Sequence, residues 1–311
     1  MLTIKTNLII LLLLTLTFAL LSCGEEKTTT KYTIGFSQCN SAEPWREAMN
    51  KELLAEVAKH SEVNLIISDG QQDNSKQVAD VENFIIQEID LLIISPNEAQ
   101  PLTQVVEKVY DSGIPVIVLD RKILSEKFTA FIGADNVKIG KAAGEYATKL
   151  LNGKGNILEI WGLKGSTPAL ERNKGFLEGI SNHPNIKIMY TQDGSWLRRK
   201  GREIMENALQ RFDKIDLVYA HNDPMAIGAY LAGVNAKRFD KTFFIGIDGL
   251  PGAEGGVQAV IDGQLSATFI YPTGGKEAIS IATKILAGEK VKKFITLGTQ
   301  TIDKSNAGNY K

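Results

Sequence analysis

The sequence has few of the residues that metal sites and disulfide frameworks require. It contains 3 His and 2 Cys in 311 residues, and His60, His183 and His221 lie far apart along the chain. Structural zinc takes about four nitrogen or sulfur ligands and catalytic zinc about three. We therefore expect no metal ion. Two Cys allow one disulfide at most. If Cys23 carries another modification, Cys39 has no partner for a disulfide in the chain.

An excess of charge and the signatures of common enzymes are also missing. The 35 Lys and Arg against 36 Asp and Glu leave a net charge of −1, without the basic surface that nucleic acid binding needs. No G-x-G-x-x-G follows a strand-like run, and neither G-x-x-x-x-G-K-[ST] nor G-x-S-x-G occurs. The segment 274–277 (Gly-Gly-Lys-Glu) lacks the hydroxyl of a phosphate loop. We expect a protein that is not an enzyme and uses no cofactor.

Long apolar runs are missing except at the N-terminus. Residues 8–21 are apolar apart from two Thr; this is shorter than the ~20 residues of a membrane span and suits a signal peptide. The run ends at Leu21-Ser22-Cys23, which resembles the lipobox of bacterial lipoproteins; the alternative is an ordinary cleavage site with an incidental Cys. We expect residues 1–22 to be a signal peptide, Cys23 to carry the lipid, and residues 23–31 to form a polar tether.

From Tyr32 onward, short β-branched runs alternate with longer segments whose apolar residues are three or four positions apart. The predicted strands are 32–37, 63–68, 90–95, 115–119, 156–161, 186–190, 217–220, 243–247 and 267–271. Helices are predicted in the second half at 138–151, 168–181, 198–211, 224–235, 252–261 and 274–288. The strands are apolar almost throughout, as in parallel sheets covered on both faces. Since about ten strands are too many for one compact sheet, the pattern predicts two doubly wound α/β lobes.

Polar and aromatic side chains follow the predicted strands, at the sheet edge where α/β proteins bind ligands. They are Ser37, Glu43, Trp45 and Arg46 after the first strand, and Asp120, Arg121, Arg172, Trp196, Asn222, Asp248 and Tyr271 at or after later ones. Carboxylates, amides and guanidinium groups form charge-assisted hydrogen bonds with sugar hydroxyls, and aromatic rings cover the C–H faces of a sugar. The set therefore indicates a site for a polyol.

Structural explanations remain open for several of these positions. Helix capping or turn formation is the alternative for Asp135, Asn136 and Asp223. A local ion pair is the alternative for Asp120 and Arg121. An enzymatic alternative would pair Asp120 with Asp248 as the two carboxylates of a glycosidase, but both have neighbours that make them better hydrogen-bond acceptors.

The order and spacing of short motifs resemble the ribose/galactose type of bacterial periplasmic sugar-binding proteins, and among them the galactofuranose-binding members. These motifs are GFSQ at 35–38, DGQQ at 69–72, LDR at 119–121, ADN at 134–136, ER at 171–172, AHND at 220–223 and GIDG at 246–249. The resemblance covers residues 32–300. It implies a type I periplasmic-binding-protein fold, in which three crossovers near 134–136, 271–272 and 296–298 join the lobes. One lobe would comprise residues 32–134 and 272–296, and the other residues 135–271 and 297–311.

The resemblance also implies roles for the predicted ligand-binding residues. Positions that hydrogen-bond sugar in the family are occupied by Asp120, Arg121, Arg172, Asn222 and Asp248, and its stacking positions by Trp45 and Trp196. Glu43 and Arg46 match more loosely, although Arg46 suits the galactofuranose-like pattern. Tyr271 departs from the ribose-type pattern, which has an amide there, and this puts ribose in doubt. No run matches the calcium loop that some galactose and glucose binders carry.

These observations predict a lipid-anchored extracytoplasmic binding protein that takes one monosaccharide between its lobes and delivers it to an ABC-type sugar transporter. The alternative is a sugar-sensing lipoprotein that presents ligand occupancy to a membrane sensor or chemoreceptor. A LacI-type repressor shares the core fold but would begin with a basic helix-turn-helix, whereas this chain begins with a signal sequence. We expect a monomer in the periplasm or at the cell surface of a bacterium, without nucleic acid.

Overall fold

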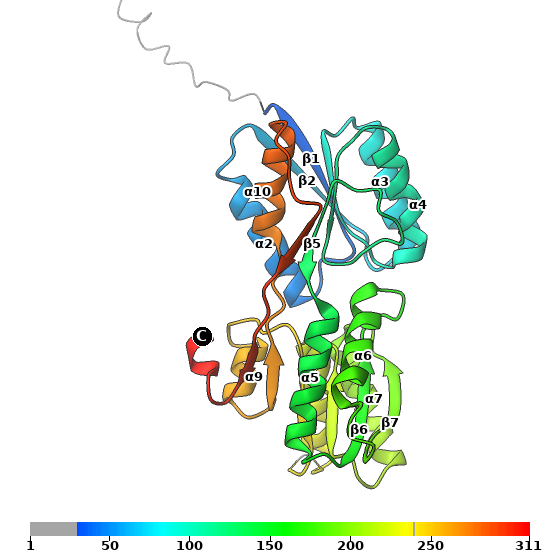
Figure 1. Cartoon of the computed structure of the whole chain (residues 1–311), viewed down its shortest axis with the longest axis vertical. Helices are drawn as coiled ribbons and strands as arrows, with labels where there is room; N and C mark the ends of the chain where they lie inside the picture. The colour runs from blue at the N-terminus through cyan, green and yellow to red at the C-terminus, as the bar shows by residue number, and fades with distance from the viewer. Residues whose placement is uncertain (1–29, 239) are drawn as a thin grey trace, which may run out of the picture.

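The computed structural model describes residues 30–238 and 240–311, which form two lobes stacked end to end (Figure 1). Each lobe contains one six-stranded sheet with helices on its faces. The predicted signal peptide and the predicted lipidation at Cys23 lie outside the described residues. Within the described ranges, none of the helices combines the length and the apolar character that a membrane span would need.

The first lobe is a parallel sheet in the order β11-β5-β4-β3-β1-β2. Its strands are β1 (Tyr32–Gln38), β2 (Val63–Asp69), β3 (Leu91–Ser95), β4 (Val116–Leu119), β5 (Ala130–Ala134) and β11 (Phe294–Leu297). Its helices are α2 (Pro44–Val57), α3 (Asn74–Ile86), α4 (Ala99–Asp111) and α10 (Gly275–Leu286). Helices α2 and α10 cover one face and α3 and α4 the other (Figure 1). Strands β3 and β4 are buried at every position, as their unbroken apolar sequences predict.

The second lobe repeats this architecture with the strand order β12-β10-β9-β8-β6-β7, in which only β12 is antiparallel to its neighbour. Its strands are β6 (Gly155–Trp161), β7 (Ile186–Asp193), β8 (Leu217–Ala220), β9 (Phe243–Ile245), β10 (Ala267–Phe269) and β12 (Thr301–Asp303). Its helices are α5 (Asn136–Leu150), α6 (Thr167–Ile180), α7 (Arg198–Arg211), α8 (Asp223–Asn235), α9 (Gly256–Ile261) and the 3-10 turn η1 (Ala307–Tyr310). The predicted fold class is confirmed.

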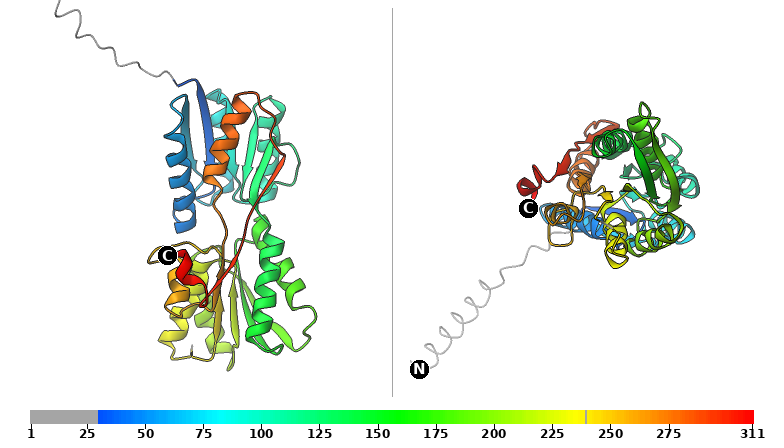
Figure 2. Two further views of the ribbon diagram at one scale, coloured as in Figure 1. Left: turned by 60° about the vertical axis from the view of Figure 1, so that its left-hand side comes forward. Right: turned by 90° about the horizontal axis from the view of Figure 1, so that it is seen from below.

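Three segments join the lobes, as the fold class predicts (Figure 2). The chain passes from β5 into α5 at Asp135, from β10 to α10 through residues 270–274, and from β11 to β12 through residues 298–300. The limits of the lobes stay a proposal. The pairing of Leu297 with Ala134 in the first sheet favours placing the last limit one residue later than the sequence pattern does.

Side-chain caps explain where several helices begin. The Asp135 carboxylate accepts the backbone N–H of Lys138, so Asp135 is the N-cap of α5. At α8 the N-cap is Asn222, whose Oδ1 accepts the N–H of Met225, and Asp223 is the first helical residue. The expected start of a helix at residue 252 is wrong: α9 begins at Gly256, because Gly252 has a φ of +91° and the chain turns there before the helix forms.

Candidate functional site

A pocket of about 300 Å³, part of it open to solvent, lies between the two lobes. It is lined by Glu43, Trp45, Arg46, Asp120, Arg121, Pro168, Arg172, Trp196, Asn222, Asp248 and Tyr271. The first five belong to the first lobe and the next five to the second, while Tyr271 stands at the segment that follows β10. The fold thus brings ten of the eleven predicted ligand-binding residues to one place; that they bind a ligand stays a prediction.

Ser37 does not line this pocket. It is fully buried within β1, and its Oγ accepts a hydrogen bond of 3.1 Å from Gln77 Nε2 of α3. Sequence reasoning also missed Pro168, which stands in the first turn of α6. A proline at a helix start has a purely structural explanation, so its residue type carried no signal of a role in the pocket.

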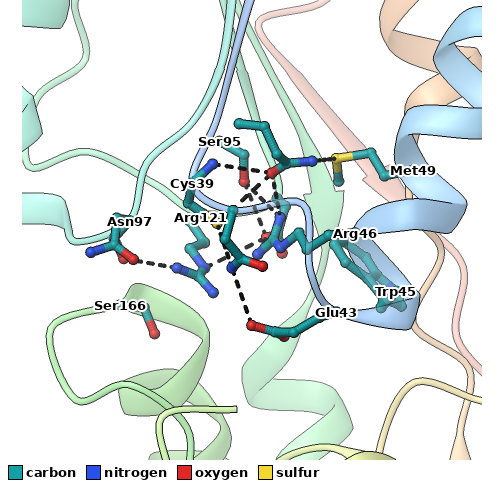
Figure 3. A network of polar contacts seen from close by, with 12 residues as sticks. Cys39, Glu43, Trp45, Arg46, Met49, Ser95, Asn97, Arg121 and Ser166 are labelled. Carbon is teal, nitrogen blue, oxygen red and sulfur yellow. Dashed lines mark hydrogen bonds and ion pairs between the residues drawn. The ribbon is translucent and has the colours of Figure 1, made fainter. Parts of the chain in front are cut away.

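Arg46 and Asp120 form a buried ion pair in the first lobe. Arg46 donates from Nη1 to Ser95 Oγ (2.9 Å) and from Nη2 to Asp120 Oδ2 (2.6 Å), as Figure 3 shows for the surroundings of Arg46. The other Asp120 oxygen, Oδ1, accepts a hydrogen bond from the Tyr271 hydroxyl. Burial alone would raise the pKa of Asp120, but the charges of Arg46 and Arg121 outweigh it and hold this pKa below its ordinary value. Asp120 is therefore a charged carboxylate with both oxygens already bound.

Arg121 is held at one end only. Its Nη1 donates to the backbone carbonyl of Asn97 (2.9 Å; Figure 3), but its buried Nε has no hydrogen-bond partner among the described residues. Asp120 Oδ2 is 3.8 Å from that Nε, too far for a hydrogen bond. The Arg121 guanidinium lies 5.5 Å from the ring centre of Trp196, which belongs to the opposite lobe. Arg121 thus lies close to a residue of the second lobe, and its Nε–H remains without an acceptor among the described residues.

Glu43 stands at the edge of the first lobe that faces the second (Figure 3). Its Oε1 accepts hydrogen bonds of 3.1 Å from Asn40 Nδ2 and from Gln72 Nε2. Burial raises the pKa of Glu43, and the nearby charges of Arg46 and Arg121 offset this rise only in part. Glu43 is therefore a second carboxyl group, beside Asp120, on the part of the pocket that the first lobe lines.

Arg172 is the central donor of the second lobe. Its Nε donates to Asn136 Oδ1 (2.9 Å) and its Nη1 to the backbone carbonyl of His221. The guanidinium lies 4.3 Å from the ring centre of Tyr271 and 5.3 Å from that of Trp196. Two fixed bonds and two rings hold the plane of the guanidinium, while Nη2 makes no hydrogen bond within the described part of the protein.

The two pocket tryptophans have different surroundings. The Trp45 ring stacks on Tyr271 at 5.2 Å, and its Nε1 donates to the Tyr271 carbonyl (2.7 Å). Trp196 has a φ of +70°, its backbone carbonyl accepts a bond of 3.0 Å from Asn222 Nδ2, and its own Nε1 has no partner among the described residues. Trp196 therefore offers both a flat apolar face and an unused donor.

Asp248 is the one pocket carboxylate that accepts no hydrogen bond from any described residue, although the residue is only 6% exposed. Burial and the neighbouring carboxylate of Asp223 raise the pKa of Asp248 well above its ordinary value, against the opposing charge of Arg172. Because Asp248 lines the pocket and has no protein donor, a ligand hydroxyl can donate to it without displacing another bond. Asp248 is therefore the acceptor most open to a ligand.

The pocket balances its charges and offers no catalytic constellation. Three guanidinium groups, from Arg46, Arg121 and Arg172, and three carboxyl groups, from Glu43, Asp120 and Asp248, line it. Within residues 30–238 and 240–311, no cluster of three or more His, Cys, Asp or Glu side chains is placed to hold a metal ion. Such a site can bind an uncharged ligand that carries several hydroxyl groups, each of which donates and accepts a hydrogen bond.

Comparisons with known proteins agree with this geometry. Residues 34–290 match the family described as periplasmic binding protein domain. The chain is 38% identical over 280 residues to the galactofuranose-binding protein YtfQ of Escherichia coli K12, with 87% of each protein covered. It is 34% identical over 268 residues to the ribose import binding protein RbsB of Bacillus subtilis 168, with 86% of this chain and 85% of the relative covered.

A solved structure is still more similar in sequence. The fructose-binding periplasmic domain of a hybrid two-component system superposes with a TM-score of 0.87 at 47% identity, covering 89% of this chain and 92% of that domain. Likeness over nearly the whole described chain means that the pocket residues belong to a shared architecture.

Proposed function

The chain belongs to the periplasmic binding protein family, and from that membership we propose that it is a lipid-anchored extracytoplasmic protein that binds one monosaccharide between its lobes and delivers it to an ABC-type sugar transporter. Its curated relatives are substrate-binding proteins, not enzymes, and this protein is accordingly a periplasmic sugar-binding protein without catalytic activity.

The observation that carries the proposed ligand class is the set of unused polar atoms around the pocket. The Asp248 carboxylate lacks a donor, and Arg121 Nε and Trp196 Nε1 lack acceptors, within the described residues. A sugar hydroxyl can donate to the first and accept from the other two. A sugar ring that packs against Trp196 would exclude water from these bonds and strengthen them.

The charge balance supports an uncharged sugar over a sugar acid or sugar phosphate. Arg46 and Arg121 already have the Asp120 carboxylate as a partner, so an anionic ligand would add another negative charge to a buried site that three carboxyl groups line. The relatives at 38% and 47% identity are a galactofuranose-binding protein and a fructose-binding domain, so galactofuranose and fructose are the first hexoses to test.

A thermal-shift screen of the purified protein tests this proposal. We expect an uncharged hexose to raise the melting temperature, since a ligand at 100 times its Kd stabilises by ~2.7 kcal/mol. Glucuronate and glucose 6-phosphate serve as charged comparison ligands and should have no effect. The Asp248→Ala variant should lose the response to the hexose. A screen of aldoses, ketoses and polyols in which none raises the melting temperature would overturn the proposal.

A sensory role is the second candidate, and one observation favours it. The solved domain at 47% identity is part of a hybrid two-component system rather than of a transporter. Deletion of the gene separates the two roles: loss of uptake of the labelled sugar supports transport, whereas normal uptake with loss of a sugar-dependent transcriptional response supports sensing.

A further inference from the structure

Asn136 stands behind the pocket, at the point where the chain crosses from the first lobe into the second. It is the first residue of α5 and only 1% exposed, and it does not line the pocket. Helix capping, which explains many polar residues in this position, does not account for it, because the neighbouring Asp135 is the cap.

The amide of Asn136 joins two pocket residues. Its Oδ1 accepts the Nε–H of Arg172 at 2.9 Å, and its Nδ2 donates to the Tyr271 hydroxyl at 3.3 Å. The amide cannot be turned around, because Arg172 has only donors and must face the oxygen. The Tyr271 oxygen then accepts a hydrogen bond from Asn136 Nδ2, so the Tyr271 hydroxyl donates its own hydrogen to Asp120 Oδ1. One amide thus sets the direction of both bonds.

The contact with Arg172 is rigidly supported. Helices α5 and α6 approach so closely that a Cβ on Gly140 would lie 2.2 Å from the Arg172 carbonyl oxygen, and one on Gly175 would lie 2.0 Å from the Val137 carbonyl oxygen. Glycine permits this backbone contact, which keeps Asn136 and Arg172 in one register as part of the second lobe. The Asn136–Arg172 bond does not depend on how the lobes are placed relative to each other.

We propose that Asn136 is a positioning residue for ligand binding: it orients the Arg172 guanidinium of the second lobe and, through Tyr271, the Asp120 carboxylate of the first. With Nε and Nη1 of Arg172 held by Asn136 and His221, the Nη2 group presents its N–H bonds to the ligand. The inference rests on the proposed function, in that the ligand is taken to be an uncharged sugar.

A double-mutant cycle on the sugar affinity tests the coupling to Arg172. Asn136→Ala should raise the Kd by ~10-fold or more. In an Arg172→Lys background, which has no Nε–H to hold, the same change should alter the Kd by less than ~2-fold. The matched control is Asn173→Ala, next to Arg172 on α6, whose amide bonds the Glu159 carboxylate instead. Its effect should be the same in both backgrounds. Equal effects of Asn136→Ala in the two backgrounds would overturn the proposal.

A conservative variant separates the two bonds of the amide. Asn136→Asp can still accept from Arg172 but cannot donate to Tyr271, and it is the test to use if Asn136→Ala folds poorly. We expect Asn136→Asp to weaken affinity in the wild-type background and to have less than ~2-fold effect in a Tyr271→Phe background. Full wild-type affinity of Asn136→Asp would contradict the role of the Tyr271 bond.

A readout on the ligand-free protein distinguishes failure of this inference from failure of the proposed function. The Arg172 Nε–H resonance, assigned by its loss in Arg172→Lys, should exchange slowly with solvent and should shift and exchange faster in Asn136→Ala but not in Asn173→Ala. If no sugar binds the wild-type protein, the function fails while this measurement still decides the Asn136–Arg172 bond; an unaltered resonance in Asn136→Ala overturns the positioning role.

Discussion

The free energy needed to bury the Asp248 carboxyl group depends on pH. Burial, with Asp223 close by, raises its pKa well above the ordinary value, and burial raises the pKa of Asp223 to about 6. Because these folded-state pKa values lie above the unfolded values, the folded protein holds more protons in the range between them. The contribution of Asp248 and Asp223 to the free energy of unfolding of the ligand-free protein therefore rises as the pH falls from 7 to ~5. Buried His221, whose pKa is lowered chiefly by desolvation, contributes in the opposite direction below its ordinary value of 6.5. Asp120, whose pKa is lowered, acts in the opposite direction only below its ordinary value.

Asp248→Asn should separate stability from binding. At pH 7–8 we expect the ligand-free variant to melt ~3 °C or more above the wild type, because no buried carboxylate is left to desolvate. This advantage should shrink as the pH approaches 5. Sugar affinity should fall by ~10-fold or more, since the amide presents one acceptor instead of two. Melting curves across pH, with titration calorimetry at pH 7.5, measure both effects. A variant less stable than wild type at pH 8 would contradict the assignment of Asp248 as an unpaired acceptor.

The segment that follows β7 places the Trp196 ring. Ser195 and Trp196 have φ values of +49° and +70°, and the Asp193 carboxylate accepts bonds from the Ser195 N–H (2.7 Å) and hydroxyl (3.0 Å). Two consecutive left-handed residues without glycine are strained, and the Asp193 bonds stabilise them. The ring then packs on Gly162, directly after β6, where a Cβ would lie 2.2 Å from its atoms.

Gly162→Ala should therefore displace the Trp196 ring. We expect sugar affinity to fall by ~10-fold, because a shifted platform loses its contact with the sugar ring, together with a change in tryptophan emission of the ligand-free protein. Gly308→Ala is the matched control, since a Cβ at Gly308 meets no heavy atom within 4 Å. Fluorescence titrations of the two variants decide the point. Wild-type affinity in Gly162→Ala would mean that Trp196 is not the platform.

Direct contacts hold the lobes together beside the pocket. The Ala99 N–H donates to the Gly165 carbonyl (3.1 Å), the Lys122 N–H to Thr167 Oγ1 (2.9 Å), and Lys122 Nζ lies 2.5 Å from Glu171 Oε1. These bonds form only when the lobes are close. A sugar that contacts both lobes would add its differential affinity to the same closed arrangement.

Gly165→Ala should weaken closure without touching the pocket. Its Cβ would lie 1.8 Å from Glu98 Oε2 of the opposite lobe, and Glu98 is itself held by Asn74 (2.7 Å). We expect a ~3–10-fold loss of affinity and, at subsaturating sugar, a radius of gyration nearer that of the ligand-free protein. Glu98→Ala should restore both in the double variant. Small-angle scattering with and without sugar measures this; a profile unaltered by saturating sugar in the wild type would mean that the lobes do not close on the ligand.

Membrane attachment is a property of the whole chain. If Cys23 carries the lipid, Cys23→Ser should move the protein from the membrane fraction to the soluble fraction while its melting temperature stays unchanged. One or more acyl chains supply the anchoring energy, at ~0.8 kcal/mol per buried CH₂. Fractionation followed by immunoblotting checks this. Continued membrane association of the variant would exclude the lipid anchor.

Sequence patterns predicted the regular part of the fold better than its edges. Runs such as those of β3 and β4 are apolar at each position, and this follows from burial on both faces. The strands next to the crossovers, β5, β11 and β12, were not predicted as strands. Strands β11 and β12 have only 4 and 3 residues, β5 contains Gly and Ala, and β11 is half-buried with Phe294 53% exposed. Their extended state depends on neighbours distant in sequence.

The local sequence determined which residues stand at the carboxyl ends of the strands, since strand ends and turns are set within a few residues. This information was enough to predict ten of the residues that line the pocket and to indicate a sugar as the class of ligand. Only the tertiary structure decided which of their atoms are free. Asp120 is fully bonded because Tyr271, 151 positions away, reaches it, whereas Asp248 has no such partner among the described residues. Hydrogen-bond satisfaction depends on contacts between distant segments, and no pattern within one segment contains it.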